Sequence, residues 1–382
     1  MNKPIAAFVA DHHSGGGYVN RGVDDSDYSL RQIVYWALKH KPDWIIFLGD
    51  VVDKQRNRSA AIMPLLDCID TLRANSIQVG FIQGNHDKSD PPWLLMDGTR
   101  WLHKETLKLG DRWFCGLDYQ TQEDVQRFLA EEVPSSVTGL LMHQTWSNFM
   151  GEICAPQCAF EDVKSPVTMV VTGDYHGECI VDTYNGRDGQ KVRVVNPGAT
   201  SLQDISEPDD KYFVVLYPND VLTRQKLETR IILHRMIHTP EDLNSFLATI
   251  SSEVTMTVAD AKDRCLPESM YKPFLRVTYS HKLPDVLRRI ENAVKNTVHL
   301  FPKEIRSTKE NKSFVVNPGS VKIGKAVTVL DLLDKEIDPE GKDNKIDKEA
   351  YLLAETLLGT QTKLQVQVAL AKWRNAVLEE NS

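Results

Sequence analysis

Short apolar runs alternate with segments of helical spacing along the first half of the chain. In the helical segments apolar residues recur every three or four positions, which predicts helices over Tyr28–Lys39 and Ala61–Leu72. Unbroken apolar runs predict buried strands at Ile5–Ala10, Trp44–Leu48, Gln78–Ile82, Gly139–Met142 and Val167–Thr172. Because these strands do not alternate apolar with polar residues, we expect an α/β sheet that is covered on both faces.

The pattern changes after about residue 196. It predicts a smaller α+β unit, with strands at Lys211–Tyr217, Thr229–Leu233 and Phe274–Tyr279 and a helix over Pro284–Val294. Residues 335–349 are highly charged and predict an exposed linker, and the apolar residues that follow predict one or two helices. We therefore divide the chain into a first domain over 1–218, an α+β domain over 219–334, a linker over 335–349 and a helical tail over 350–382.

Polar residues with metal-binding side chains follow each of the five strands of the first domain. They are Asp11 and His13, Asp50, Asn85 and His86, His143, and Asp174 and His176. Open α/β sheets place ligand sites beyond the carboxyl ends of their strands, so these five loops are expected to converge on one site. Mixed His, Asp and Asn side chains suit Mn, Fe or Zn ions, and one carboxylate that bridges two ions makes a two-metal site.

Each cluster also has an ordinary structural interpretation. An Asp after a Gly is common in turns, Asn-His-Asp after a Gly can begin a helix, and a single His at a strand end is more often a satisfied core or surface residue. These interpretations would have to coincide at five strand ends in a set that completes two coordination shells. The combination therefore favours the metal site.

The order of the motifs resembles the calcineurin-like metallophosphoesterase superfamily over about residues 5–200. The motifs are Asp-x-His at 11–13, Gly-Asp-x-x-Asp at 49–53, Gly-Asn-His-Asp at 84–87, His143, and Gly-x-x-His at 173–176. The resemblance implies a four-layer α/β/β/α sandwich with two divalent metal ions. It implies one ion held by Asp11, His13, Asp50 and His176, and a second held by Asp50, Asn85, His143 and Asp174. It also implies that His86 acts on the leaving group and that Asp53 is a second catalytic candidate.

Asp174 departs from the family pattern, which has His at this place. A carboxylate is a competent ligand, but its charge lowers the Lewis acidity of the ion and favours hard metals. We therefore expect Mn²⁺, with Mg²⁺, Fe²⁺ or Zn²⁺ as alternatives.

Within the superfamily the chain is most similar to the SbcD-type DNA repair nucleases and their phage counterparts. The residues that carry this similarity are the early Asp11 and the segment Val195–Thr200, followed by Lys211–Tyr217 and then by an α+β unit and a tail. The similarity implies a DNA exonuclease or endonuclease in repair, recombination or phage DNA metabolism, with the α+β unit as a cap domain. It also implies a homodimer, an SbcC-type SMC-like ATPase as partner, and a cytoplasmic place in a bacterial or phage-infected cell.

Two other functions stay open. One is a phosphodiesterase or phosphatase that acts on small nucleotides or phosphoproteins, although a small single-domain phosphodiesterase would not need the long C-terminal half. The other is a non-catalytic scaffold with this fold, but such proteins lose metal ligands and this chain keeps them.

Charge and cysteine content add less. The net charge of −8 weighs mildly against a DNA substrate. Basic residues in the predicted cap could contact DNA, but any single one is more often a solvated surface charge. These residues are Arg224, Arg230, Arg235, Lys272, Arg276, Arg288 and Arg289. Cys154 and Cys158 have no second Cys pair at zinc-site spacing, which favours reduced thiols. Apolar runs are too short for a membrane span, and Ile5–Ala10 fits a strand better than a targeting segment.

Overall fold

The computed structural model describes residues 2–15, 23–53, 58–89, 92, 98–150, 156–204, 207–280, 283 and 285–305. By its internal contacts the chain divides into two units, and all described residues belong to the first, which comprises Met1–Met150 and Pro156–Asn311. The predicted linker over 335–349, the predicted helical tail over 350–382 and Cys154 lie outside the described residues.

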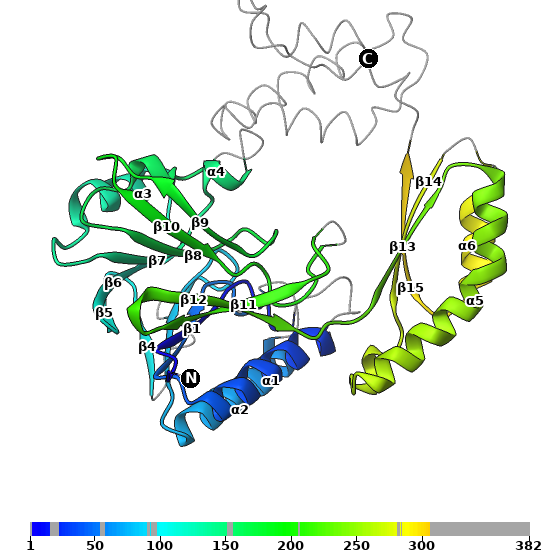
Figure 1. Ribbon diagram of the computed structural model, residues 1–382, viewed down its shortest axis with the longest axis horizontal. Coiled ribbons are helices and arrows are strands. Elements are labelled where there is room, and N and C mark those ends of the chain that lie inside the picture. The colour runs from blue at the N-terminus through cyan, green and yellow to red at the C-terminus, as the bar shows by residue number, and fades with distance from the viewer. Residues whose placement is uncertain are drawn as a thin grey trace, which may run out of the picture. The chain divides into compact units, whose positions relative to one another are not determined.

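The first sheet has six strands in the order β12-β11-β1-β2-β3-β4. Its parallel strands are β1 (Ala6–Val9), β2 (Trp44–Leu48), β3 (Gln78–Ile82) and β4 (Thr99–Trp101), and the antiparallel strands β11 (Lys211–Tyr217) and β12 (Val221–Leu227) extend it beyond β1. Helices α1 (Val23–His40) and α2 (Arg58–Ala74) pack side by side against one face of this sheet (Figure 1). The sheet continues to Leu227, which is beyond the predicted domain boundary at 218, because β12 pairs with β11 along its whole length.

The second sheet also has six strands, in the order β5-β6-β7-β8-β10-β9. The strands are β5 (Thr106–Leu109), β6 (Arg112–Leu117), β7 (Gly139–His143), β8 (Met169–Gly173), β9 (Ile180–Asn185) and β10 (Lys191–Asn196). Its outer face is covered by the helical segments α3 (Gln122–Arg127), a π-helix (Phe128–Glu132), α4 (Ser147–Met150) and a 3₁₀ turn (Phe160–Asp162).

The two sheets pack face to face. Phe8 and Ile46 of the first sheet belong to the same buried cluster as Leu141 and Val171 of the second, and all four are fully buried. Helices therefore lie outside each sheet, and a buried apolar layer lies between the sheets. This confirms the predicted four-layer α/β/β/α arrangement.

A smaller α+β unit follows, and we call it the cap. Its sheet has three parallel strands, β13 (Ile232–Ile237), β14 (Phe274–Ser280) and β15 (His299–Ile305). Helices α5 (Pro240–Asp263) and α6 (Val286–Val294) connect these strands and pack on the sheet in one apolar cluster. Helix α5, which the apolar pattern did not predict, begins with a capping box in which Thr239 and Asp242 each bond the other's backbone N–H.

A buried ion pair joins the cap to the first domain. Arg230, which precedes β13, donates two hydrogen bonds to the carboxylate of Asp25 in α1, at 2.6 and 3.0 Å. The same guanidinium donates to the backbone oxygens of Ser269 and Lys272 and lies 5.0 Å from the ring centroid of Phe274. Arg230 and Asp25 are both buried, and their opposite charges are in direct contact.

Candidate metal centre

The loop after β1 brings two predicted ligands into the interior. Asp11 and His13 are buried, and both have positive φ angles, of 47° and 49°. Ala10 pairs with Ala199 just before this loop, and the backbone N–H of His13 donates to the backbone oxygen of Asp50 at 2.8 Å. The loop is therefore held in an uncommon conformation by backbone contacts, and this conformation turns both side chains toward one point.

The loop after β2 brings Asp50 to the same point. Gly49 has a φ of +86°, and a Cβ there would lie 2.4 Å from the ring of His143, so only glycine fits. The carboxylate of Asp50 accepts a hydrogen bond from the backbone N–H of His86 at 2.8 Å through Oδ1. Its Oδ2 lies 3.6 Å from Nε2 of His13 and 3.5 Å from Nε2 of His143. Asp50 thus stands between two histidines, which is the place of a bridging ligand.

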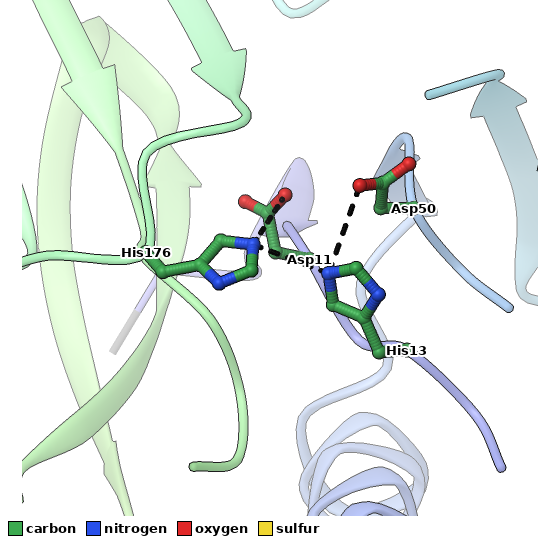
Figure 2. Close-up of side chains that lie close together, drawn as sticks. All are labelled: Asp11, His13, Asp50 and His176. Carbon is green, nitrogen blue, oxygen red and sulfur yellow. Dashed lines mark hydrogen bonds and ion pairs between the residues drawn. The ribbon is translucent and has the colours of Figure 1, made fainter. Parts of the chain in front are cut away.

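Asp11, His13, Asp50 and His176 each offer one donor atom, and these four atoms all lie within 4.8 Å of one another (Figure 2). The Nε2 atoms of His13 and His176 are 3.1 Å apart, and Nε2 of His176 is 3.5 Å from Oδ1 of Asp11. This group coincides with the ligand set that the resemblance implies for the first ion.

The residues predicted for the second ion gather around His143. Its Nδ1 donates to the backbone oxygen of Leu48 at 2.6 Å, which leaves Nε2 facing the site. From Nε2 the distances are 3.2 Å to Oδ1 of Asn85, 3.5 Å to Oδ2 of Asp50 and 3.7 Å to Oδ1 of Asp174. The carboxylate at position 174 therefore lies among these residues, and its own backbone N–H donates to both oxygens of Asp11 at 3.1 Å.

His86 lies at the rim of this group. Its side chain is 35% exposed, whereas that of His143 is fully buried. Nδ1 of His86 lies 3.3 Å from Oδ1 of Asp53, and its ring meets the ring of His13 edge-on with centroids 4.9 Å apart. Because His86 is partly exposed beside the buried candidate ligands, its ring could contact a substrate that approaches from the solvent.

Protonated His143 and His176 would lower the pKa values of the carboxylates in the centre. Burial opposes ionisation of Asp11, but the hydrogen bond and charge of His176 hold its pKa below the ordinary value. Burial likewise opposes ionisation of Asp50, but His143 lowers its pKa. Burial lowers the pKa of His176, but Asp11 and Glu207 outweigh this and raise it to about 10. A divalent cation could replace these protons between the same carboxylates, so the residues present fit divalent metal ions.

Several supporting residues were not predicted. Thr145 and Glu207 bond Asp174 and His176 directly. Asp87 belongs to the Gly-Asn-His-Asp motif, and its carboxylate accepts from the backbone N–H groups of Val51 and Gly84, both at 2.6 Å. It thereby ties the loop after β2 to the loop after β3. Asp87 is part of a recognised motif, but Thr145 and Glu207 are not, so the sequence offered no signal for these two residues.

The Asn-Pro-Gly turn after β10 and the carboxylate after β6 support the site from outside. Asn196 donates from Nδ2 to the backbone oxygen of Tyr175 at 3.0 Å and accepts from the N–H of Gly198, so the turn holds the loop that carries Asp174 and His176.

Asp118, which is buried, accepts from the backbone N–H of Gln83 at 2.8 Å and from Nε1 of Trp101 at 3.0 Å. Burial raises the pKa of Asp118 to about 6.

Residues 6–177 match the family model of the calcineurin-like phosphoesterases. Together with the four-layer fold and the converging ligands, this match shows that the chain contains a calcineurin-like metallophosphoesterase domain. The domain is that of a metal-dependent hydrolase.

Individual relatives are more distant. A DNA double-strand break repair protein Mre11 from Nanoarchaeum equitans is 34% identical over 85 residues, which are 22% of this chain and 24% of the relative. Among solved structures, a dimetal phosphatase from Danio rerio is 13% identical with a TM-score of 0.41, covering 59% of this chain and 96% of that one. The nuclease MPE from Pseudomonas putida is 16% identical with a TM-score of 0.31, covering 55% and 84%. None of the helices in the described residues is long and apolar enough to cross a membrane.

Proposed function

We propose that this protein is a metal-dependent phosphodiesterase that cleaves DNA, of the SbcD type. The observation that carries the proposal is the convergence of all eight predicted polar residues, from Asp11 to His176, at neighbouring strand ends in the order that the resemblance requires. The similarity to an Mre11 repair protein supports DNA as the substrate, although it spans about a quarter of that protein. The α+β cap after the phosphoesterase domain supports the same choice.

The chemistry that two bound divalent cations supply is polarisation of the phosphate and generation of a hydroxide nucleophile near neutral pH. Asp11, His13, Asp50 and His176 would hold one cation, and Asn85, His143 and Asp174 would complete the site of the other around Asp50. His86 is placed to protonate the departing oxygen, because it lies beside these ligands at the solvent edge. Asp53, 3.3 Å from Nδ1 of His86, orients that ring.

The cap offers fewer DNA contacts than its sequence alone suggests. Arg230 is buried against Asp25, Arg276 bonds Asp209 at 2.8 Å, and Arg235 pairs with Glu253. Arg288 and Arg289 in α6 of the cap remain exposed, and so does Arg224 in β12 of the first sheet. A DNA strand would therefore be attracted mainly by the cations at the site, while these exposed arginines add contacts to the phosphate backbone.

The assay that tests the proposal compares three substrates in the presence of Mn²⁺. Duplex DNA, single-stranded DNA and bis(p-nitrophenyl) phosphate are each incubated with the protein and with the variant Asp50→Asn, which removes the charge of the bridging position. We expect Mn²⁺-dependent shortening of DNA that the variant lacks. Hydrolysis of the small ester without cleavage of either DNA would instead favour a phosphodiesterase of small nucleotides, and no hydrolysis of any substrate would favour a scaffold.

The partners follow from the similarity to SbcD-type nucleases. We propose a homodimer that binds an SMC-like ATPase of the SbcC type through the apolar residues of the predicted tail over 350–382. The support is the sequence of this segment, where a charged linker precedes apolar residues at helical spacing.

A further inference from the structure

Glu207 contacts the metal centre from a loop outside all the recognised motifs. Its Oε1 atom lies 2.9 Å from Nδ1 of His176, and its side chain is only 6% exposed. Nδ1 of His176 donates to this carboxylate, so the lone pair of the neutral ring is on Nε2. That is the atom that faces Oδ1 of Asp11 and Nε2 of His13.

The carboxylate of Glu207 is itself held rigidly. Oε1 also accepts from the backbone N–H of Asp204 at 3.1 Å, while Oε2 accepts from the backbone N–H of Gln203 at 3.1 Å and from Nζ of Lys211 at 2.7 Å. Lys211 is 3% exposed. Three donors besides His176 therefore hold both oxygens, and a carboxylate held in this way can fix the ring that it contacts.

The cap holds the same loop from its other side. Arg276 of β14 donates from Nη2 to the backbone oxygen of Glu207 at 2.9 Å and from Nη1 to Oδ1 of Asp209 at 2.8 Å. Nε2 of His234 in β13 lies 2.6 Å from Oδ2 of Asp209. The contacts form an unbroken series from cap strands β13 and β14 to a ligand of the metal centre.

We propose that Glu207 is a positioning residue of the metal centre, which fixes the tautomer and orientation of His176, and that the cap supports it through Arg276. The proposal rests on the metal centre of the proposed function but not on its DNA substrate. Partners of this kind contribute to metal affinity because a ring that is already oriented loses less entropy when it binds an ion. His176 would belong to one ion alone, so the effect is confined to one of two Mn²⁺ sites.

The test is calorimetric titration of the metal-free full chain with Mn²⁺, resolved into two sites, beside thermal melting of each metal-free variant. In Glu207→Ala we expect the affinity of one site to fall by about 10–100-fold while the other is unchanged. Glu207→Gln should regain part of this loss, because its amide oxygen can still accept from Nδ1 of His176. Arg276→Met should weaken the same site by a smaller factor.

Lys211→Met removes one of the donors that hold Glu207 but leaves the carboxylate on His176. It should therefore lower Mn²⁺ affinity at the same site by a smaller factor than Glu207→Ala. Parental affinity at both sites in Glu207→Ala, or an equal loss in Lys211→Met, would overturn the role of Glu207. Unchanged affinity in Arg276→Met would overturn the role of the cap. A protein that binds two Mn²⁺ ions but leaves DNA intact would contradict the proposed function and leave this test valid.

Discussion

Thr145 donates a hydrogen bond from Oγ1 to Oδ2 of Asp174 at 2.6 Å, while the other oxygen of Asp174 lies 3.7 Å from Nε2 of His143. Thr145 is in turn held by Oε1 of Gln157, which accepts from its backbone N–H at 2.9 Å. The threonine thus fixes the one carboxylate that stands where the family has a histidine. One oxygen is occupied by the hydroxyl and the other is left to face the site.

This arrangement predicts how the metal preference depends on Asp174. Asp174→His should shift the preference from Mn²⁺ toward Zn²⁺ or Fe²⁺, because imidazole is a softer ligand than carboxylate. The measurement is the rate of phosphodiester hydrolysis with each metal, together with the metal content of the purified protein. Full activity and unchanged metal dependence in Asp174→Ala would show that Asp174 is not a ligand.

The rim position of His86 predicts a loss of rate without a loss of metal. His86→Ala should keep both Mn²⁺ ions but reduce the turnover rate by roughly 10²–10⁴-fold, the usual contribution of a general acid. Asp53→Asn should reduce it less, since the ring of His86 keeps its contact with His13. Calorimetry and single-turnover kinetics separate the two effects. If His86→Ala loses an ion, His86 is a ligand and its proposed role is wrong.

Metal binding should stabilise the fold. Asp11 and Asp50 are both buried within a few ångströms of each other, and a cation between them replaces histidine protons. A free Mn²⁺ concentration of 100 times the dissociation constant should add about 2.7 kcal/mol to the free energy of unfolding. Thermal melting with Mn²⁺ and with EDTA measures this, and Asp50→Asn should abolish most of the difference. Equal melting temperatures with metal and with EDTA would contradict the metal centre.

Asp118 predicts a pH dependence of stability. Its pKa is raised from 3.8 to about 6 in the folded protein, so between these values the folded state binds more protons than the unfolded state. The contribution of Asp118 to the free energy of unfolding must then fall as pH rises from 4 to 7. Asp118→Asn cannot titrate, so its stability relative to the parent should rise over this range by up to roughly 3 kcal/mol. Denaturant unfolding at each pH measures the difference, and a constant difference would contradict the raised pKa.

Removal of the tail tests the proposed ATPase contact. A chain that ends at Pro339 lacks the predicted helices and should keep its Mn²⁺-dependent activity, but it should no longer bind the SMC-like ATPase in a pull-down. The full chain is the control. A much lower melting temperature, or continued binding of the ATPase, would show that the tail is part of the folded core.

The sequence allowed the candidate ligands to be predicted because each one lies at the carboxyl end of a strand or within a few residues after it. Asp50 and Asn85 come after runs of continuous apolar residues, and the predicted bounds of β2 and β3 are the observed ones. Parallel strands end at the same edge of a sheet, so position in the chain was enough to infer position in space. The family resemblance then supplied the order of the motifs.

Other features could not be predicted for different reasons. Glu207 reaches His176 only because the loop before β11 folds back over the site, and no local pattern records that contact. Helix α5 did carry a signal, since the capping box at Thr239 precedes Leu243, Phe246 and Ile250 at helical spacing. Its many Thr and Ser residues dilute the apolar pattern. The strand predicted at Thr229–Leu233 in fact begins at Ile232, because Arg230 turns inward to Asp25.

The ion pair between Arg230 and Asp25 determines how the protein can be divided. A fragment that stops at the predicted boundary after residue 218 would remove β12 from the first sheet and Arg230 from Asp25. Such a fragment would leave Asp25 without the guanidinium that it bonds in the full chain. Gene fusions or exchanges of the cap would therefore have to carry Asp25 and Arg230 together.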